Sequence, residues 1–319
     1  MKKKTMKAIC KLPGEKNPRL IEKPIPKIGP TDVLVKVAYA GICKTDLKVA
    51  NGELQSKSNG VILGHEFSGT IICCGRDINP VINIGRRVSA NPMLDDISDK
   101  MFGKDIDGCF AEYISVPFSN IVQMDYCDDM KFSAYMEPIA AALGAVTAIN
   151  YPLNNPKING IIAGDPNDRI ANLISMCYKF LNNPPLSDKQ HLQIIKPEEL
   201  LIKKDLGEFN GYDYIIECCP TVAGSLLKCL NRKGTLILKS RGYCELSNVV
   251  VNDIVMRELT IIGAKYFDNF NFVQDFMSRH AEGLKCMIAD KDFKLEEFEE
   301  AFIEASSPNA KKVMFKCAQ

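Results

Sequence analysis

Gly41-Ile-Cys-Lys-Thr-Asp46 is followed about twenty residues later by Gly64-His65-Glu66, and the rest of the chain is organised around these two segments. Cys43 offers a soft anionic thiolate and His65 offers an imidazole nitrogen, and zinc favours both kinds of ligand. A free cysteine is more often a small buried hydrophobic residue, so this pair alone is a weak signal. A metal site therefore needs support from elsewhere in the chain.

That support comes from Met136-Glu137-Pro138, which stands in an alanine-rich run with helical character from Ser133 to Ile149. Proline is tolerated at a helix start, so Glu137 is expected in the first turn. Its carboxylate can ligate zinc directly or hold the water bound to the metal. The alternative is an acidic residue that interacts with the helix macrodipole. Glu66 is the other candidate carboxylate, and the choice between the two stays open.

Together the three segments resemble the zinc-dependent medium-chain alcohol and polyol dehydrogenases, including the threonine and sorbitol dehydrogenases, whose motifs read roughly GICG[ST]D, GHE and EP. Asp107-Gly-Cys-Phe-Ala-Glu-Tyr113 extends the resemblance. The resemblance implies an α/β protein with a β-rich, GroES-like catalytic domain and a doubly wound, parallel-sheet Rossmann domain. It also implies one catalytic zinc, held by Cys43, His65 and either Glu66 or Glu137.

The family also implies roles for the residues around the metal. Thr45 would be the first proton acceptor, and we expect it in an extended segment, on the same side as the Cys43 thiol. Asp46 is expected to accept the second ring N–H of His65 and fix its tautomer. Many relatives continue the proton relay through a histidine where this chain has Lys48. A lysine carries a proton onward only if its pKa is lowered, so water is the alternative exit path.

Zinc alcohol dehydrogenases often carry a second, structural zinc on a lobe with four closely spaced cysteines. The corresponding stretch here, Asn91 to Gly108, has no cysteine. We therefore expect a single zinc.

Length, charge and cysteine usage restrict the class of protein further. The chain has 319 residues, 46% of them hydrophobic, which is enough for two domain cores. A formal net charge of +1 gives no long-range field, so we expect neither a nucleic-acid partner nor a membrane surface. Thirteen cysteines without a C-x-x-C pattern fit reduced thiols in the cytoplasm better than a disulfide framework. The expected partner is a small alcohol or ketone, and the family resemblance implies a homodimer or homotetramer.

Tyr151-Pro-Leu-Asn-Asn-Pro156 has the composition of a linker. We therefore predict a catalytic zinc domain from residues 1–149 and 266–319, and a nucleotide-binding domain from residues 150–265. The longest apolar stretch, Pro138 to Ile149, is too short to span a bilayer.

Alternating strands and helices predict a parallel, doubly wound sheet in the second domain. Only some fifteen residues separate a strand at 191–196 from a strand at 212–217, so one α/β unit is expected to be reduced. The chain then returns to the first domain, with an amphipathic helix expected over 293–302 and a closing strand over 312–316.

Ile158-Asn-Gly-Ile-Ile-Ala-Gly164 reads as a buried strand that ends where a nucleotide-binding fold places its phosphate loop. Gly164 keeps the first glycine of the G-x-G-x-x-G pattern, while proline replaces the second and Arg169 replaces the third. Asp165 and Asp168 bring negative charge towards a pyrophosphate. Arg169 is a candidate phosphate partner.

The second predicted strand ends in Lys196 rather than in the acid that binds the ribose of NAD. A lysine there either accepts a 2′-phosphate or is a solvated strand end. Lys239 and Arg241 are further cations at the same predicted sheet edge. We therefore expect weak dinucleotide binding that favours NADP over NAD.

These observations predict a zinc-dependent oxidoreductase that transfers a hydride between a secondary alcohol or polyol, or the matching ketone, and a nicotinamide dinucleotide. The alternative is a redox-inactive relative that serves as a zinc-containing binding or scaffold protein.

Overall fold

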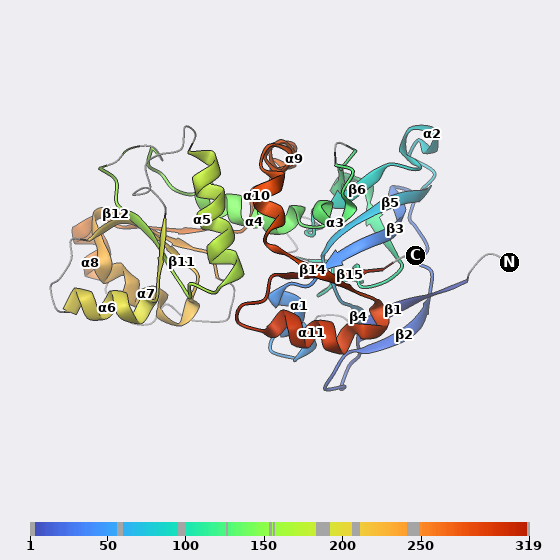
Figure 1. Ribbon diagram of the computed structural model, residues 1–319, viewed down its shortest axis with the longest axis horizontal. Coiled ribbons are helices and arrows are strands. Elements are labelled where there is room, and N and C mark those ends of the chain that lie inside the picture. Colours follow the sequence, from blue (N-terminus) through green and yellow to red (C-terminus); the bar gives the residue numbers. More distant parts are fainter. Residues whose placement is uncertain are drawn as a thin grey trace. The chain divides into compact units, whose positions relative to one another are not determined.

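The computed structural model describes residues 4–55, 60–94, 100–125, 127–152, 155, 157–182, 192–205, 211–240, 249 and 251–317. The chain divides into two compact units, unit 1 from Met1–Glu137 with Gln274–Gln319 and unit 2 from Pro138–Val273. Unit 1 is rich in antiparallel strands and unit 2 is built on a parallel sheet, so the predicted fold class is confirmed (Figure 1). The predicted domain boundaries at residues 149 and 265 stay predictions.

The strands of unit 1 are β1 Thr5–Lys11, β2 Arg19–Pro24, β3 Asp32–Gly41, β4 Val61–Ile62, β5 Glu66–Cys74, β6 Arg87–Ala90, β7 Tyr113–Pro117, β8 Ile121–Gln123, β14 Ile288–Phe293 and β15 Lys312–Lys316. The larger sheet has the order β14-β15-β3-β5-β6-β8, with β7 also paired to β3, and the smaller sheet has the order β2-β1-β4. The closing strand predicted over 312–316 is confirmed.

The helices of unit 1 are α1 Lys44–Ala50, α2 Pro80–Asn83, α3 Met130–Ser133, α10 Ala281–Lys285 and α11 Phe298–Ser306, with 3₁₀ turns η1 Phe118–Asn120 and η5 Leu295–Glu297. Helices α4 Met136–Thr147 and α9 Phe270–Arg279 cross the limits of the units. The helix predicted over 293–302 begins too early. Phe293 ends β14, and the Lys294 backbone N–H donates to the Glu297 carboxylate at 2.7 Å, which starts the helical turn one residue later.

Strand β3 positions the site because its alternating valines anchor it. Val33, Val35 and Val37 are fully buried in the core of unit 1. The antiparallel register with β5 sets Gly41 opposite Glu66. The residues that follow β3 and those that begin β5 therefore meet at one end of the sheet.

Unit 2 contains β9 Gly160–Ala163, β10 Gln193–Ile195, β11 Tyr212–Glu217, β12 Leu230–Leu238 and β13 Thr260–Gly263, together with α5 Arg169–Leu181, α6 Pro197–Asp205, α7 Ala223–Leu226, α8 Val251–Arg257 and the 3₁₀ turns η3 Pro220–Val222 and η4 Leu227–Cys229. The strands pair in parallel in the order β10-β9-β11-β12-β13. Between β10 and β11 the described residues form α6 and no further strand. The reduction by one α/β unit stays a prediction.

Candidate metal centre and nucleotide edge

Cys43, His65 and Glu66 come together where β3 ends and β5 begins. One potential ligand atom from each side chain lies within 4.8 Å of the others. His65 and Glu66 are almost fully buried, and Cys43 is half-buried. Gly64 makes this approach possible because its φ is +93° and a Cβ there would collide with the Phe110 ring.

Asp46 orients the imidazole of this cluster. Its Oδ1 lies 2.9 Å from His65 Nδ1, so the predicted contact is present and the other ring nitrogen is left for a metal. Burial of the ring lowers the pKa of His65, but the charge of Asp46 and hydrogen bonds to Asp46 and Cys43 outweigh burial and raise it well above its usual value.

The same aspartate starts helix α1. Asp46 Oδ2 accepts a hydrogen bond from the Cys43 backbone N–H at 2.9 Å, so the chain turns helical at Lys44. Thr45 therefore lies in the first turn of α1, and the expectation of an extended segment is wrong. Thr45 and Lys48 are three residues apart on this helix and share a face. Their proposed roles in proton transfer stay predictions.

Lys312, the first residue of β15, is a member of the site that the sequence reasoning missed. Its Nζ lies 2.8 and 2.7 Å from the two carboxylate oxygens of Glu66 and donates to the Ile42 carbonyl at 3.3 Å. Both partners of this ion pair are buried. The sequence does carry a signal for Lys312, because it places a lysine at an inward-facing position of an apolar strand. A buried ammonium group needs a partner of opposite charge or a hydrogen-bond acceptor.

This ion pair bears on the choice of the third zinc ligand. Burial raises the pKa of the Glu66 carboxyl, the charge of Lys312 opposes that rise, and the charge of Glu137 adds to it. Glu137 lies in the first turn of α4 but outside the cluster formed by Cys43, His65 and Glu66. Glu66 lies closer than Glu137 to Cys43 and His65, but both of its carboxylate oxygens already accept hydrogen bonds from Lys312. The ligand set and the single zinc stay predictions.

The predicted nucleotide residues follow the carboxyl ends of the parallel strands in unit 2. Gly164 follows β9, Lys196 follows β10, Lys239 follows β12, and Arg169 is the first residue of α5. The Lys239 ammonium donates to the Ala264 carbonyl at 3.1 Å and to the Lys265 carbonyl. Lys239 thus holds the segment after β13. Arg241 lies outside the described residues.

The parallel sheet fits a dinucleotide, because its strand order places a topological switch point between β9 and β11. The loop after β9 does not fit. Asp168 accepts hydrogen bonds from the backbone N–H groups of Ile170 and Ala171, at 2.8 and 3.4 Å, and these groups would otherwise face a pyrophosphate.

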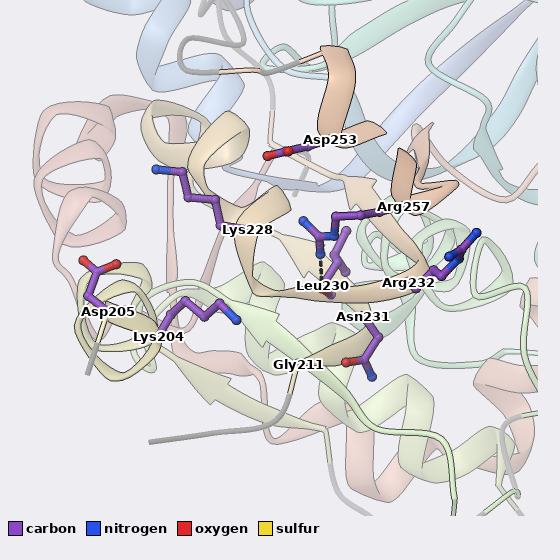
Figure 2. A pocket seen from close by; sticks show the side chains of 9 residues that line it. All are labelled: Lys204, Asp205, Gly211, Lys228, Leu230, Asn231, Arg232, Asp253 and Arg257. Carbon is purple, nitrogen blue, oxygen red and sulfur yellow. Dashed lines mark hydrogen bonds between the residues drawn. The ribbon is translucent and has the colours of Figure 1, made fainter. Parts of the chain in front are cut away.

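A hollow of about 670 Å³ lies at the opposite edge of the same sheet, near the amino ends of β11 and β12 (Figure 2). Lys204, Lys228, Arg232, Arg257, Asp205 and Asp253 line it. Arg257 donates to the carbonyls of Leu227 and Leu230, so its guanidinium holds η4 against the start of β12. Among the described residues that line this hollow there is no thiolate or imidazole to favour zinc.

Residues 29–126 match the family described as "Alcohol dehydrogenase GroES-like domain". The chain is 28% identical over 338 residues to L-threonine 3-dehydrogenase of Bacillus licheniformis, which covers 93% of this chain and 94% of the relative. It is 23% identical over 346 residues to D-arabitol-phosphate dehydrogenase of Enterococcus avium, with 98% of each chain covered. The solved structure of 2R,3R-butanediol dehydrogenase from Bacillus subtilis has the same fold, with a TM-score of 0.79 at 22% identity over 98% of this chain and 99% of that one. No helix among the described residues is long and apolar enough to cross a membrane.

Proposed function

Because the chain belongs to the zinc-dependent medium-chain alcohol and polyol dehydrogenase family, we propose that it transfers a hydride between a secondary alcohol or polyol, or the matching ketone, and a nicotinamide dinucleotide. The observation that carries this proposal is the grouping of the half-buried Cys43 with the buried His65 and Glu66 in unit 1. A thiolate, an imidazole and a carboxylate form a donor set that suits catalytic zinc.

Cys43, His65 and one of Glu66 and Glu137 would hold the zinc. When bound, the metal would polarise the substrate oxygen and lower the pKa of its hydroxyl. Asp46 keeps His65 in the orientation that a metal needs. Thr45 takes the hydroxyl proton, and Lys48 or water passes it to solvent.

The substrate class is a secondary alcohol with polar neighbours. L-threonine 3-dehydrogenase and D-arabitol-phosphate dehydrogenase, the relatives named above, support this choice. The cofactor is a dinucleotide that binds weakly at the carboxyl edge of the unit 2 sheet, with Gly164, Arg169 and Lys196 nearby and NADP favoured over NAD. Lys239 contributes at the same edge by holding the segment after β13.

We also propose a cytoplasmic homodimer or homotetramer. Strand β13 supports self-association, because over the described residues it pairs only with β12 and ends the sheet. Light scattering on the purified protein would measure the assembly.

The test combines metal analysis with an assay for reduction of NAD and NADP at millimolar concentration, using L-threonine, arabitol and butane-2,3-diol. We expect about one zinc per chain and alcohol-dependent formation of NADPH or NADH. In the Cys43→Ala control, zinc content and activity should both collapse while the fold survives, because the thiolate is a ligand and the core lies elsewhere. Wild-type protein without zinc, or zinc protein that oxidises none of these alcohols, would contradict the proposal.

A further inference from the structure

The N-terminus of α5 lies at the crevice where the fold would take a pyrophosphate. Gly164 follows β9 and Cys218 follows β11, and these two strands flank the switch point of the sheet. The Cys218 backbone N–H donates to the Ala163 carbonyl at 2.9 Å, and a Cβ on Gly164 would lie 3.1 Å from the Cys218 Cβ. Helix α5 begins at Arg169, so its first N–H groups are close to this crevice.

The loop that enters α5 is closed by its own hydrogen bonds. Asp168 Oδ1 accepts from the backbone N–H groups of Ile170 and Ala171. The Asn172 side chain donates to the carbonyls of Pro166 and Asp168, at 2.7 and 2.9 Å. Two of the backbone N–H groups that a phosphate loop presents to its ligand, those of Ile170 and Ala171, therefore have partners within the chain.

Asp165 closes the other half of the loop. Its Oδ1 accepts from the Asn167 backbone N–H, and its carbonyl accepts from the Asp168 backbone N–H, both at 2.8 Å. Pro166 has no N–H to offer. An incoming pyrophosphate would have to displace the Asp168 carboxylate and would meet its like charge.

We propose that Asp168 is an affinity-determining residue, whose carboxylate occupies the anion site at the start of α5 and keeps the dinucleotide weakly bound. This inference rests on the proposed function, because it concerns the cofactor of that reaction. Removal of the side chain frees the Ile170 and Ala171 donors. Glycine is a tolerated N-cap, so Asp168→Gly frees them with little loss of helix stability.

The experiment is a fluorescence titration of the zinc-loaded protein with NADH and NADPH. Asp168→Gly should bind both about tenfold or more tightly than the wild type, because each regained charge-assisted hydrogen bond is worth about a decade of affinity. Asp168→Asn removes the charge but keeps a capping oxygen, so its gain should be smaller.

The matched control is Asp165→Asn, which removes the same charge from the same loop and keeps an Oδ1 that accepts from the Asn167 backbone N–H group. Its gain in affinity for NADH and NADPH should stay below about threefold, because the charge of the exposed Asp165 is screened by solvent. Competition with ADP-ribose and with adenosine identifies the part of the dinucleotide that is responsible for the tighter binding. ADP-ribose should follow NADH, whereas adenosine, which has no pyrophosphate, should bind all variants equally.

Asp168→Gly that binds NADH with the affinity of the wild type overturns the inference, whatever that affinity is. Equal gains in affinity in Asp165→Asn and Asp168→Gly overturn it as well, because general charge would then explain the effect. The proposed function fails separately, if wild-type zinc protein oxidises no alcohol at saturating cofactor.

Discussion

The Lys312–Glu66 ion pair is buried beside the proposed zinc ligands, so each charge depends on the other. The pair links β15 to the start of β5 through two contacts, of 2.7 and 2.8 Å. Removal of one partner leaves an uncompensated charge in the core. The pair therefore contributes to the fold of unit 1 as well as to the position of Glu66.

Lys312→Met should lower the free energy of unfolding of the zinc-free protein by about 3–5 kcal/mol. Urea denaturation measures this loss. Lys316→Met, at the exposed end of the same strand, is the control and should change stability by less than about 0.5 kcal/mol. The double variant Glu66→Gln/Lys312→Met should recover much of the loss, and a double variant as unstable as the sum of both single changes would rule out the coupling.

Glu217 is a buried acid of unit 2, at the end of β11. Its carboxylate accepts from the Ser240 hydroxyl at 2.6 Å, yet burial outweighs the hydrogen bonds and raises the pKa of Glu217 above its usual value. The unfolded chain therefore ionises at a lower pH than the folded chain. The contribution of Glu217 to stability is fully present below the usual glutamate range and is lost as the pH rises through the folded pKa.

Glu217→Gln removes this dependence, since glutamine does not titrate. The stability of the wild type relative to Glu217→Gln should be higher at about pH 4, below the usual glutamate pKa, than at about pH 7. Urea denaturation of both proteins at the two pH values measures the difference. A difference that stays constant would mean that Glu217 titrates as in the unfolded chain.

At the scale of elements, the tight connection between β4 and β5 decides whether the metal ligands meet. Gly64 holds a positive φ directly before His65, and a Cβ would collide with the Phe110 ring and lie 2.8 Å from Cys109 Sγ. A side chain there strains the backbone and pushes the segment away from its neighbours.

Gly64→Ala should therefore reduce zinc occupancy at least tenfold, measured by metal analysis after dialysis against a weak chelator. Gly85→Ala is the matched control, because Gly85 has a similar φ of +89° and no atom within 4 Å of the added Cβ. It carries the backbone strain of about 1 kcal/mol without the collision, so zinc should be retained. Equal zinc loss in both variants would assign the effect to strain and not to the position of His65.

The sequence predicted elements well where local pattern decides them. The valines of β3 and the apolar residues of β15 predicted strands correctly, because inward-facing and outward-facing positions alternate along both segments. The prediction of an extended segment at Thr45 was wrong. The hydrogen bond from the Cys43 backbone N–H to Asp46 starts a helix there, and the two-residue alternation of a strand does not reveal it. The sequence reasoning missed Lys312, because that contact joins residues 246 positions apart and depends on tertiary packing.

At the scale of the whole molecule, the two units divide the chemistry. The proposed zinc ligands lie in unit 1, whereas the predicted nucleotide residues lie in unit 2. The short spacing between β10 and β11 predicts a reduced sheet in unit 2. The closure of its phosphate loop was only half predictable, because the sequence shows the charge of Asp168 but not the N–H groups that it occupies.

This division predicts that each ligand protects its own unit against hydrogen exchange. A ligand that binds only the folded state stabilises the structure that holds it, by about 2.7 kcal/mol at a hundredfold excess over Kd. Zinc added to the metal-free protein should slow exchange around β3, α1 and β5, with Cys43→Ala as the unresponsive control. NADPH added to Asp168→Gly should instead slow exchange at β9 and α5. Zinc protection concentrated in residues 138–273 would place the metal in the wrong unit and would remove Cys43 and His65 from the site.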